Sequence, residues 1–254
     1  MPHPSANIGE PFISFSQVGS TNDEAREAIQ KGLATHGMTF FSSNQVAGRG
    51  QRGKTWLSEP GASVALTALI KPDFLTVLQQ FELNKAMALA VWDTVADLTG
   101  KEDLRIKWPN DLYWKDKKLG GILIESVLTS SGQWSWALVG IGLNCNQRSF
   151  DRSLLNPVSL AQISDIAHDP NLVARRLCVS LQLRLEQLRS KNTAQIEAQY
   201  EQLLYKKDQV AHFRTGNRQF SAVVKGVSRT GELRLEGEST AYATGSIEWL
   251  LHGQ

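Results

Sequence analysis

The sequence has 254 residues, 41% of them apolar, which suffices for one large domain or for a main domain with a small appendage. Its 27 basic and 25 acidic side chains give a net charge of +2, so no overall field favours binding to nucleic acid or to a membrane. Two cysteines are too few for a disulfide framework, residues 1–11 lack the apolar core of a signal peptide, and no run reaches the roughly 18–20 apolar residues of a membrane span. We therefore expect a soluble cytoplasmic protein.

The first elements along the chain are predicted to be a strand and a helix. Residues 11–18 carry regularly spaced apolar side chains and favour a strand. Thr21 and Glu24 have the spacing of a capping box, which predicts a helix from this point to about Gly32. On these residues alone, the polar run Ser20-Thr21-Asn22 is best explained as a helix cap.

Residues 48–55, Gly-Arg-Gly-Gln-Arg-Gly-Lys-Thr, match both GxxxxGK[ST] of nucleotide hydrolases and GxGxxG of dinucleotide-binding proteins. Both patterns need a strand before the loop and a helix directly after it, whose N-terminal amides hold the phosphate. Residues 38–41 are a suitable strand. However, Pro60 and Gly61 end any helix within a turn, and a β-prone run follows at 63–70. We therefore reject both patterns.

The remaining interpretation is a cationic glycine loop that binds an anion through Arg49, Arg52, Lys54 and free backbone N–H groups. Because its three glycines make ordering costly, we expect the loop to be mobile until a ligand neutralises its arginines. Two alternatives stay open at this point. The segment could be a solvated surface hairpin, or an arginine–glycine segment that touches RNA.

A long helix and then a series of strands are predicted in the middle of the chain. Apolar residues recur at helical spacing from Leu83 to Leu98, and Gly100 ends the helix. The predicted strands are 104–108, 112–114, 119–127 and 133–143. Gly140 and Gly142 lie inside the last strand, where glycine usually marks a bulge or the close approach of another group.

The C-terminal third changes character after Tyr205. Leucine-rich stripes predict helices at 173–188 and 194–204. Short alternating segments separated by glycine-containing turns then follow, at 209–213, 220–224, 232–235 and 247–250. They predict a small β-barrel or open sandwich. We accordingly divide the chain into domains 1–204 and 205–254.

Few residues point to chemistry by themselves. Lys118 precedes Gly120 and Gly121 at a strand start, where it could reach an anion without hindrance, although a solvated lysine beside a turn is the more common case. The absence of HExxH, CxxC and GxSxG from the sequence argues against zinc enzymes and serine hydrolases.

Five motifs in one fixed order resemble those of the biotin–protein ligases. They are Ser20-Thr21-Asn22; Gln45 with the glycine loop and Trp56; KWPND at 107–111; KxGGILxE at 118–125; and GIGxNxN at 140–146. The later helices and the C-terminal β segment also fit this family, so the resemblance covers nearly the whole chain. Larger members begin with a winged helix-turn-helix. Because the first strand here starts by Phe12, we expect neither that domain nor DNA binding.

The resemblance implies an α+β catalytic domain, a mixed sheet covered by helices as in class II synthetases, followed by a small all-β SH3-like barrel. It also implies two reactions in one site. Biotin and ATP, with Mg²⁺, give biotinoyl-5′-AMP and pyrophosphate, and a lysine of a biotin carboxyl carrier domain then takes the biotinoyl group and releases AMP. No membrane partner is implied, and the resemblance leaves a homodimer open.

The resemblance assigns roles to individual residues. Lys118, Arg49 and Arg52 are expected to be catalytic, because charge develops on phosphate during adenylation. The expected biotin-binding residues are Ser20, Thr21, Asn22, Gln45, Arg49, Gly50, Gln51, Lys118, Gly120 and Gly121. The expected ATP-binding residues are Arg49, Gly50, Gln51, Arg52, Trp56, Lys107, Asn110, Gly142 and Asn144. Asp111 is the expected metal-side carboxylate.

One position departs from the family pattern. The family loop commonly has arginine where this sequence has Gln51, so one cation is missing beside the phosphate. We expect this to weaken retention of the adenylate rather than its formation. The segment 245–248 is only a loose match to the ending of the family's barrel.

Other functions stay open. The sister lipoate–protein ligases and octanoyl transferases share the catalytic fold and a lysine acceptor. However, the transferases use no ATP, and lipoate ligases lack the combination of KWPND with KxGGILxE. An RNA-binding module is the alternative from a different class, and the near-neutral charge counts against it.

Overall fold

The computed structural model describes residues 7–190 and 192–251 of the protein. Part of the stretch considered for a signal peptide, and the outer ends of both predicted domains, therefore lie outside the described residues. None of the described helices is both long and apolar enough to cross a membrane.

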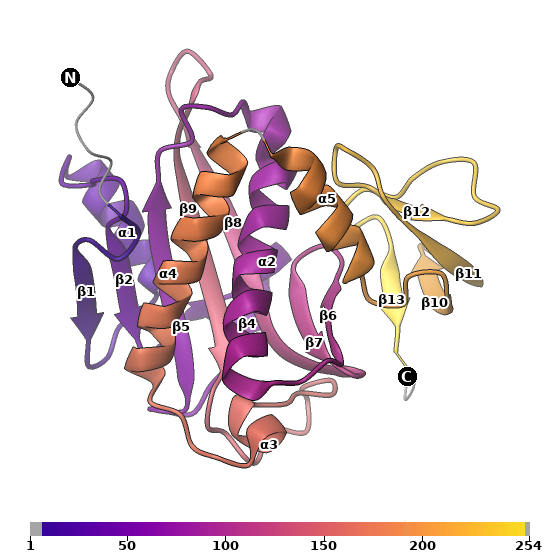
Figure 1. The fold of residues 1–254 in the computed structure, drawn as a ribbon, viewed down its shortest axis with the longest axis horizontal. Helices are drawn as coiled ribbons and strands as arrows, with labels where there is room; N and C mark the ends of the chain where they lie inside the picture. The colour runs from indigo at the N-terminus through magenta and orange to yellow at the C-terminus, as the bar shows by residue number, and fades with distance from the viewer. Residues whose placement is uncertain (1–6, 191, 252–254) are drawn as a thin grey trace.

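A seven-stranded mixed sheet forms the centre of the molecule, in the order β1-β2-β5-β9-β8-β7-β6 (Figure 1). Its strands are β1 (Phe12–Phe15), β2 (Thr39–Ser42), β5 (Ser63–Ile70), β6 (Leu104–Lys107), β7 (Asp111–Trp114), β8 (Lys117–Leu128) and β9 (Trp134–Asn144). β1 and β2 are parallel, and all other neighbours are antiparallel. Each strand of this sheet overlaps a segment predicted from the sequence.

Helices cover both faces of the central sheet. They are α1 (Thr21–Gln30), α2 (Gln80–Thr99), α3 (Leu160–Ser164), α4 (Pro170–Arg189) and α5 (Thr193–Gln202). α2 and α4 lie side by side over one face (Figure 1), whereas Ala25 of α1 packs on Phe40 and Leu69 at the other face. β5 is buried along its whole length between these layers, which explains its nearly continuous apolar sequence.

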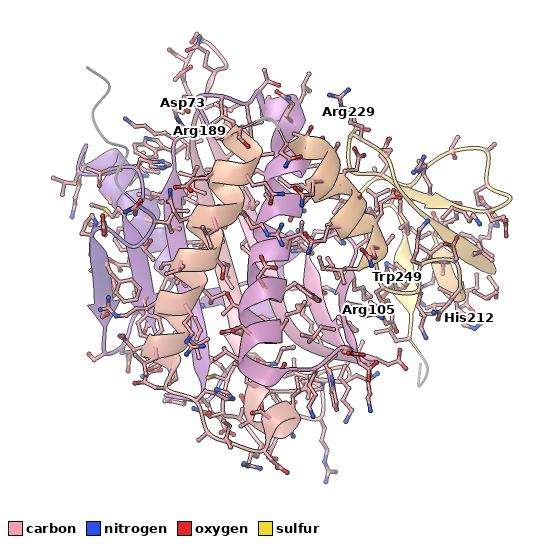
Figure 2. The ribbon with its side chains drawn as sticks, in the orientation of Figure 1. Asp73, Arg105, Arg189, His212, Arg229 and Trp249 are labelled. Carbon is pink, nitrogen blue, oxygen red and sulfur yellow. The ribbon has the colours of Figure 1, made fainter. Side chains whose placement is uncertain are left out.

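The C-terminal segment forms a second, four-stranded antiparallel sheet in the order β12-β11-β10-β13. Its strands are β10 (Val210–Thr215), β11 (Arg218–Val227), β12 (Leu233–Leu235) and β13 (Glu248–Leu250). Trp249 of β13, which is labelled in Figure 2, packs against Tyr205 at the junction with the rest of the chain. The predicted boundary at 204/205 lies between α5 and β10, and the division into two domains stays a prediction.

The glycine loop forms a short hairpin. β3 (Gly48–Arg49) pairs with β4 (Thr55–Trp56), and a 3₁₀ turn at Gln51–Gly53 joins them. No helix follows the loop within the described residues before β5, which confirms the rejection of the two nucleotide-binding patterns. The hairpin geometry is one of the alternatives considered from the sequence.

The predicted capping box at the start of α1 is wrong. Ser20 rather than Thr21 is the N-cap residue, and no side-chain capping bond is formed there. The backbone N–H groups of Asp23 and Glu24 instead bond to the Ser20 carbonyl. Capping therefore does not explain the side chains of Thr21 and Asn22, which have other partners.

Candidate active site

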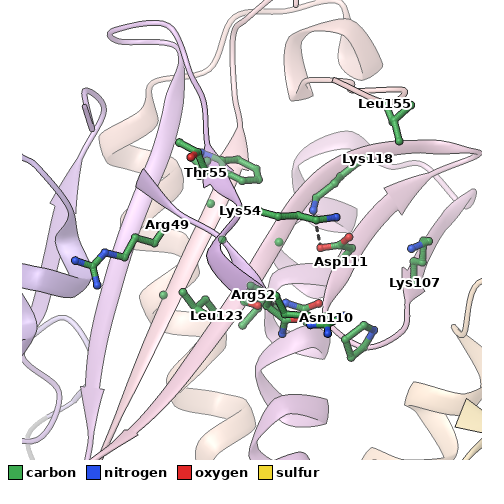
Figure 3. Close-up of a pocket in the computed structure, with 18 of the residues that line it drawn as sticks. Arg49, Arg52, Lys54, Thr55, Lys107, Asn110, Asp111, Lys118, Leu123 and Leu155 are labelled. Atoms are coloured by element: carbon green, nitrogen blue, oxygen red, sulfur yellow. Dashed lines mark hydrogen bonds and ion pairs between the residues drawn. The ribbon is translucent and has the colours of Figure 1, made fainter. Parts of the chain in front are cut away.

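A cavity of about 970 Å³ lies between the central sheet, the glycine hairpin and the C-terminal segment (Figure 3). Of the residues expected to form a site, all but Gly120 line this cavity. A Cβ on Gly120 would come within 2.8 Å of the Gly142 carbonyl oxygen, so this glycine allows close packing of β8 on β9. The structure thus brings together segments that are far apart in the sequence.

One end of the cavity is polar and buried. Ser20, Thr21 and Asn22 are only 2–5% exposed. Both the backbone N–H and the hydroxyl of Thr21 contact Gln45 Oε1, at 2.8 and 3.2 Å. Thr67 Oγ1 lies 2.8 Å from Thr21 Oγ1 and 2.5 Å from Asn22 Oδ1. These hydroxyl and amide groups can recognise a small ligand that has both donors and acceptors.

The other end of the cavity is cationic. Lys118 Nζ forms an ion pair with Asp111 Oδ1 at 2.8 Å (Figure 3). Lys107 Nζ lies 5.5 Å from the ring centroid of Tyr113 and 5.2 Å from that of Trp249. Burial lowers the pKa of Lys107 to about 8; Asp111 opposes this, while nearby lysines reinforce it. An anion placed here would reduce the repulsion among these lysines.

The two arginines of the hairpin have protein partners. Arg49 pairs with Asp23 at 3.0 Å, and Arg52 donates to the backbone oxygen of Gly245 at 2.8 Å. A guanidinium has five N–H donors, so each arginine retains donors for an anion. Lys54 completes the cations of the hairpin, and it also lines the cavity.

The glycines of β9 allow the close approach of side chains that line the cavity. A Cβ on Gly140 would lie 2.5 Å from Asn22 Oδ1, and one on Gly142 would lie 2.6 Å from the Trp56 ring. Strand glycines therefore did indicate a close approach, but the groups that approach belong to the protein itself. The Trp56 indole N–H is buried there and has no hydrogen-bond partner among the described residues.

Two of the expected nucleotide-binding amides also stabilise the wall of the cavity. Asn110 Nδ2 bonds to the Ile122 carbonyl, and Asn144 Nδ2 bonds to the Val158 carbonyl at 3.0 Å. Both residues are buried, at 6% and 5% exposure. Their amide oxygens remain the groups that could accept from a ligand.

Asp111 is the carboxylate paired with Lys118 at the cationic end, whereas Glu248, which also lines the cavity, is paired with Arg214. Nowhere in 7–190 and 192–251 do three His, Cys, Asp or Glu side chains gather in the manner of a protein-built metal cage. Mg²⁺ commonly keeps several waters and binds through one or two carboxylates plus substrate phosphates. One carboxylate, Asp111, beside several lysines fits that mode of binding.

The sequence analysis missed part of the cavity wall. Residues from β10 and from 244–251 line it, although only 245–248 had been noted from the sequence, as a loose match. Two residues behind the wall were missed as well. Thr67, which is fully buried, gave no signal because it lies inside the apolar run of β5. Glu125, which bonds to Asn22, was visible only as the last residue of a motif.

Comparisons with known proteins bear directly on this arrangement. The sequence model of the Biotin/lipoate A/B protein ligase family matches residues 14–144, just over half of the chain. The chain belongs to this family. The Bifunctional ligase/repressor BirA of Escherichia coli is 28% identical over 227 residues, covering 86% of this chain and 67% of the relative.

Two more relatives carry the name Biotin--[acetyl-CoA-carboxylase] ligase. The protein of Mycobacterium tuberculosis is 31% identical over 189 residues, covering 73% of this chain and 67% of its own length. That of Paracoccus denitrificans is 29% identical over 228 residues, covering 88% and 93%.

Solved structures of the family share the fold. A biotin protein ligase from Aquifex aeolicus, in complex with biotin and ATP, superposes with a TM-score of 0.76 at 23% identity and covers 95% of each chain. One from Leishmania major, in complex with biotinyl-5-AMP, gives a TM-score of 0.63 at 20% identity over 94% of this chain and 97% of its own. These likenesses confirm the predicted α+β fold with its small C-terminal SH3-like sheet.

Proposed function

We propose that this chain is an ATP-dependent biotin–protein ligase. The observation that carries the proposal is a single cavity with a buried polar end and a cationic end, roofed by the glycine hairpin. Its family membership and the biotin ligases among its relatives agree with this activity. The sister activities on lipoate or octanoate are less favoured, since these acyl chains carry no ring of polar groups for the buried polar end.

The polar end suits the ureido ring of biotin, whose carbonyl accepts and whose two N–H groups donate hydrogen bonds. Ser20 and Thr21 offer hydroxyl groups, and the Gln45 amide oxygen already lies within 3.2 Å of Thr21. A buried polar site rejects ligands that leave its groups unpaired, which gives specificity as well as affinity.

The cationic end suits the phosphates of ATP. In the first reaction a biotin carboxylate oxygen forms a bond to the α-phosphorus, and the bond from that phosphorus to pyrophosphate breaks. Negative charge gathers on phosphate oxygens, where the Lys118 ammonium and the hairpin arginines stabilise it. We assign Trp56 and Asn144 to the border of the adenine, with Lys107, Asn110 and Gly142 beside the nucleotide.

In the second reaction, the amine of an acceptor lysine attacks the acyl carbon of biotinoyl-5′-AMP and AMP leaves with the electrons of the broken C–O bond. The attacking nitrogen loses a proton in this step. Because the mixed anhydride hydrolyses in water, the hairpin that roofs the cavity has a protective role as well as a binding role.

Asp111 would hold Mg²⁺ on the phosphate side, where the ion neutralises charge on the phosphates. The acceptor that the relatives' names suggest is the biotin carrier domain of a carboxylase. We further infer a cytosolic location, which the two free, buried cysteines support.

The test is biotin-dependent exchange of labelled pyrophosphate into ATP by the purified chain with Mg²⁺. We expect exchange with biotin and little with lipoate or octanoate. Exchange only with lipoate or octanoate would move the activity to a sister family. No exchange, together with RNA binding that weakens steeply with salt, would favour a binding module.

A further inference from the structure

A charge pair outside the cavity is connected to its polar end. Glu125, on β8, accepts a hydrogen bond from Asn22 Nδ2 at 2.6 Å through one carboxylate oxygen. Its other oxygen accepts from Arg26 of α1 at 2.8 Å. The side chains of Arg26 and Glu125 are 36% and 26% exposed, and neither residue lines the cavity.

Glu125 fixes the orientation of the Asn22 side-chain amide. The oxygen and nitrogen of an amide have nearly the same shape, so packing against Gly140 cannot distinguish the two orientations. A carboxylate can only accept, and therefore it holds the Asn22 NH₂ group on its own side. The Asn22 oxygen is consequently directed at Thr67 Oγ1, 2.5 Å away.

This orientation is transmitted to the ligand-facing groups. Thr67, which is fully buried, lies within hydrogen-bond distance of both Asn22 and Thr21, and Thr21 contacts Gln45. In a buried chain of hydrogen bonds, the direction of one donor fixes the next, because each unpaired group is costly. These contacts link the Arg26–Glu125 ion pair at the surface to the polar end of the cavity.

We propose that Glu125 and Arg26 are positioning residues that set the donor and acceptor pattern presented to the ring of biotin. The inference rests on the proposed function, because it assigns the polar end to that ring. Neither residue touches the ligand. They act through the Asn22 amide and the hydroxyls of Thr67 and Thr21.

The decisive variants are Glu125→Gln alone and in combination with Arg26→Met. When Arg26 is present, its guanidinium donates to the amide oxygen of the substituted side chain. The NH₂ group of that side chain then faces the Asn22 NH₂ group, and neither of these groups can accept a hydrogen bond. We expect the KM for biotin in pyrophosphate exchange to rise about 10- to 100-fold, the effect of losing one charge-assisted bond, with the KM for ATP changed less than about twofold.

Removing Arg26 as well frees the amide oxygen to accept from Asn22. We therefore expect the double variant to recover a KM for biotin within about threefold of wild type, and Arg26→Met alone to change it by less than about threefold. If the two residues had only a structural role, the double variant would instead have the highest KM for biotin of the three variants.

A matched control is the pair Arg176–Asp97, an exposed ion pair at 2.8 Å between α4 and α2. Arg176→Met with Asp97→Asn should leave the KM for biotin unchanged. Thr67→Val provides a second route if Glu125→Gln does not fold, since it removes only the connecting hydroxyl and should also raise the KM for biotin at least tenfold.

The outcomes distinguish a failure of the proposed function from a failure of the positioning role. Wild-type protein without biotin-dependent exchange would refute the proposed function. Wild-type exchange combined with an unchanged KM for biotin in Glu125→Gln or in Thr67→Val would overturn only the positioning role. A double variant with a higher KM for biotin than Glu125→Gln would also overturn the positioning role.

Discussion

Lys118 and Asp111 form an ion pair at 2.8 Å in the cationic end of the cavity. Both are partly buried, with side-chain exposures of 34% and 19%. Since the carboxylate holds the ammonium at the cationic end before any substrate arrives, little reorganisation is needed when phosphate charge develops. The pair is therefore the first place to test the chemistry.

Lys118→Ala should lower the rate of pyrophosphate exchange roughly 10²- to 10³-fold, as loss of one charge-stabilising donor does. Single-turnover formation of biotinoyl-5′-AMP is the direct measurement. A loss below about threefold would return Lys118 to the class of solvated lysines near turns. No covalent biotinyl-Lys118 should be trapped in the wild-type protein.

The lowered pKa of Lys107 leads us to expect that ATP binding depends on pH. Burial lowers its pKa to about 8, so the side chain is cationic below this pH and neutral above it. If the cation contributes to phosphate binding, the KM for ATP should rise as the pH increases through about 8. In Lys107→Met, this rise should disappear and the KM for ATP should be high throughout. A KM profile identical in both proteins would remove Lys107 from the nucleotide site.

At the scale of elements, regular periodicity and the helix-ending glycine were informative, whereas the capping pattern was not. The apolar spacing of α2 and its ending at Gly100, which has a φ of +61°, were predicted correctly. α3 was missed because five residues give no periodic signal. The spacing of Thr21 and Glu24 satisfied a capping rule, although tertiary partners use the Thr21 and Asn22 side chains instead. Such partners depend on contacts between distant residues, which a local pattern does not contain.

Gln51 of the glycine hairpin is expected to affect the rate at which biotinoyl-5′-AMP dissociates. The resemblance to biotin–protein ligases predicts an arginine where this chain has Gln51, and the neutral side chain lacks a charge-assisted bond worth on the order of 1.5–3 kcal/mol. Gln51→Arg should therefore slow dissociation of biotinoyl-5′-AMP about 10- to 100-fold. Release of labelled adenylate measures this rate.

Lys54 could replace the missing charge, because it lines the cavity and acts electrostatically on Lys107. In that case Gln51→Arg would change the release rate little, while Lys54→Ala would increase it strongly. The two variants together thus decide which side chain of the hairpin retains the adenylate.

At the scale of the whole molecule, the hairpin is joined to the C-terminal segment. Arg52 donates to the Gly245 carbonyl, and a Cβ on Gly245 would lie only 2.3 Å from the Arg52 guanidinium carbon. Gly245→Ala should displace Arg52 and expose the hairpin to trypsin, giving several-fold faster cleavage within residues 49–54 by mass spectrometry.

Gly237→Ala is the matched control for this experiment. Gly237 has a φ of +79°, close to the +85° of Gly245, but nothing lies within 4 Å of its virtual Cβ. Both variants carry similar backbone strain, and only one disturbs Arg52. Equal cleavage of the hairpin in the two would mean that strain, and not the lost contact, is responsible.

The contact between Arg52 and Gly245 spans 193 positions of the sequence. During synthesis, the central sheet and its helices are made before this partner, because β9 ends at Asn144 and α5 ends at Gln202. The nascent chain can therefore complete its main core while one wall of the cavity does not yet exist. Biotin activation should begin only when Gly245 and β13 have emerged, so shorter nascent chains would not release a reactive acyl-adenylate into the cell.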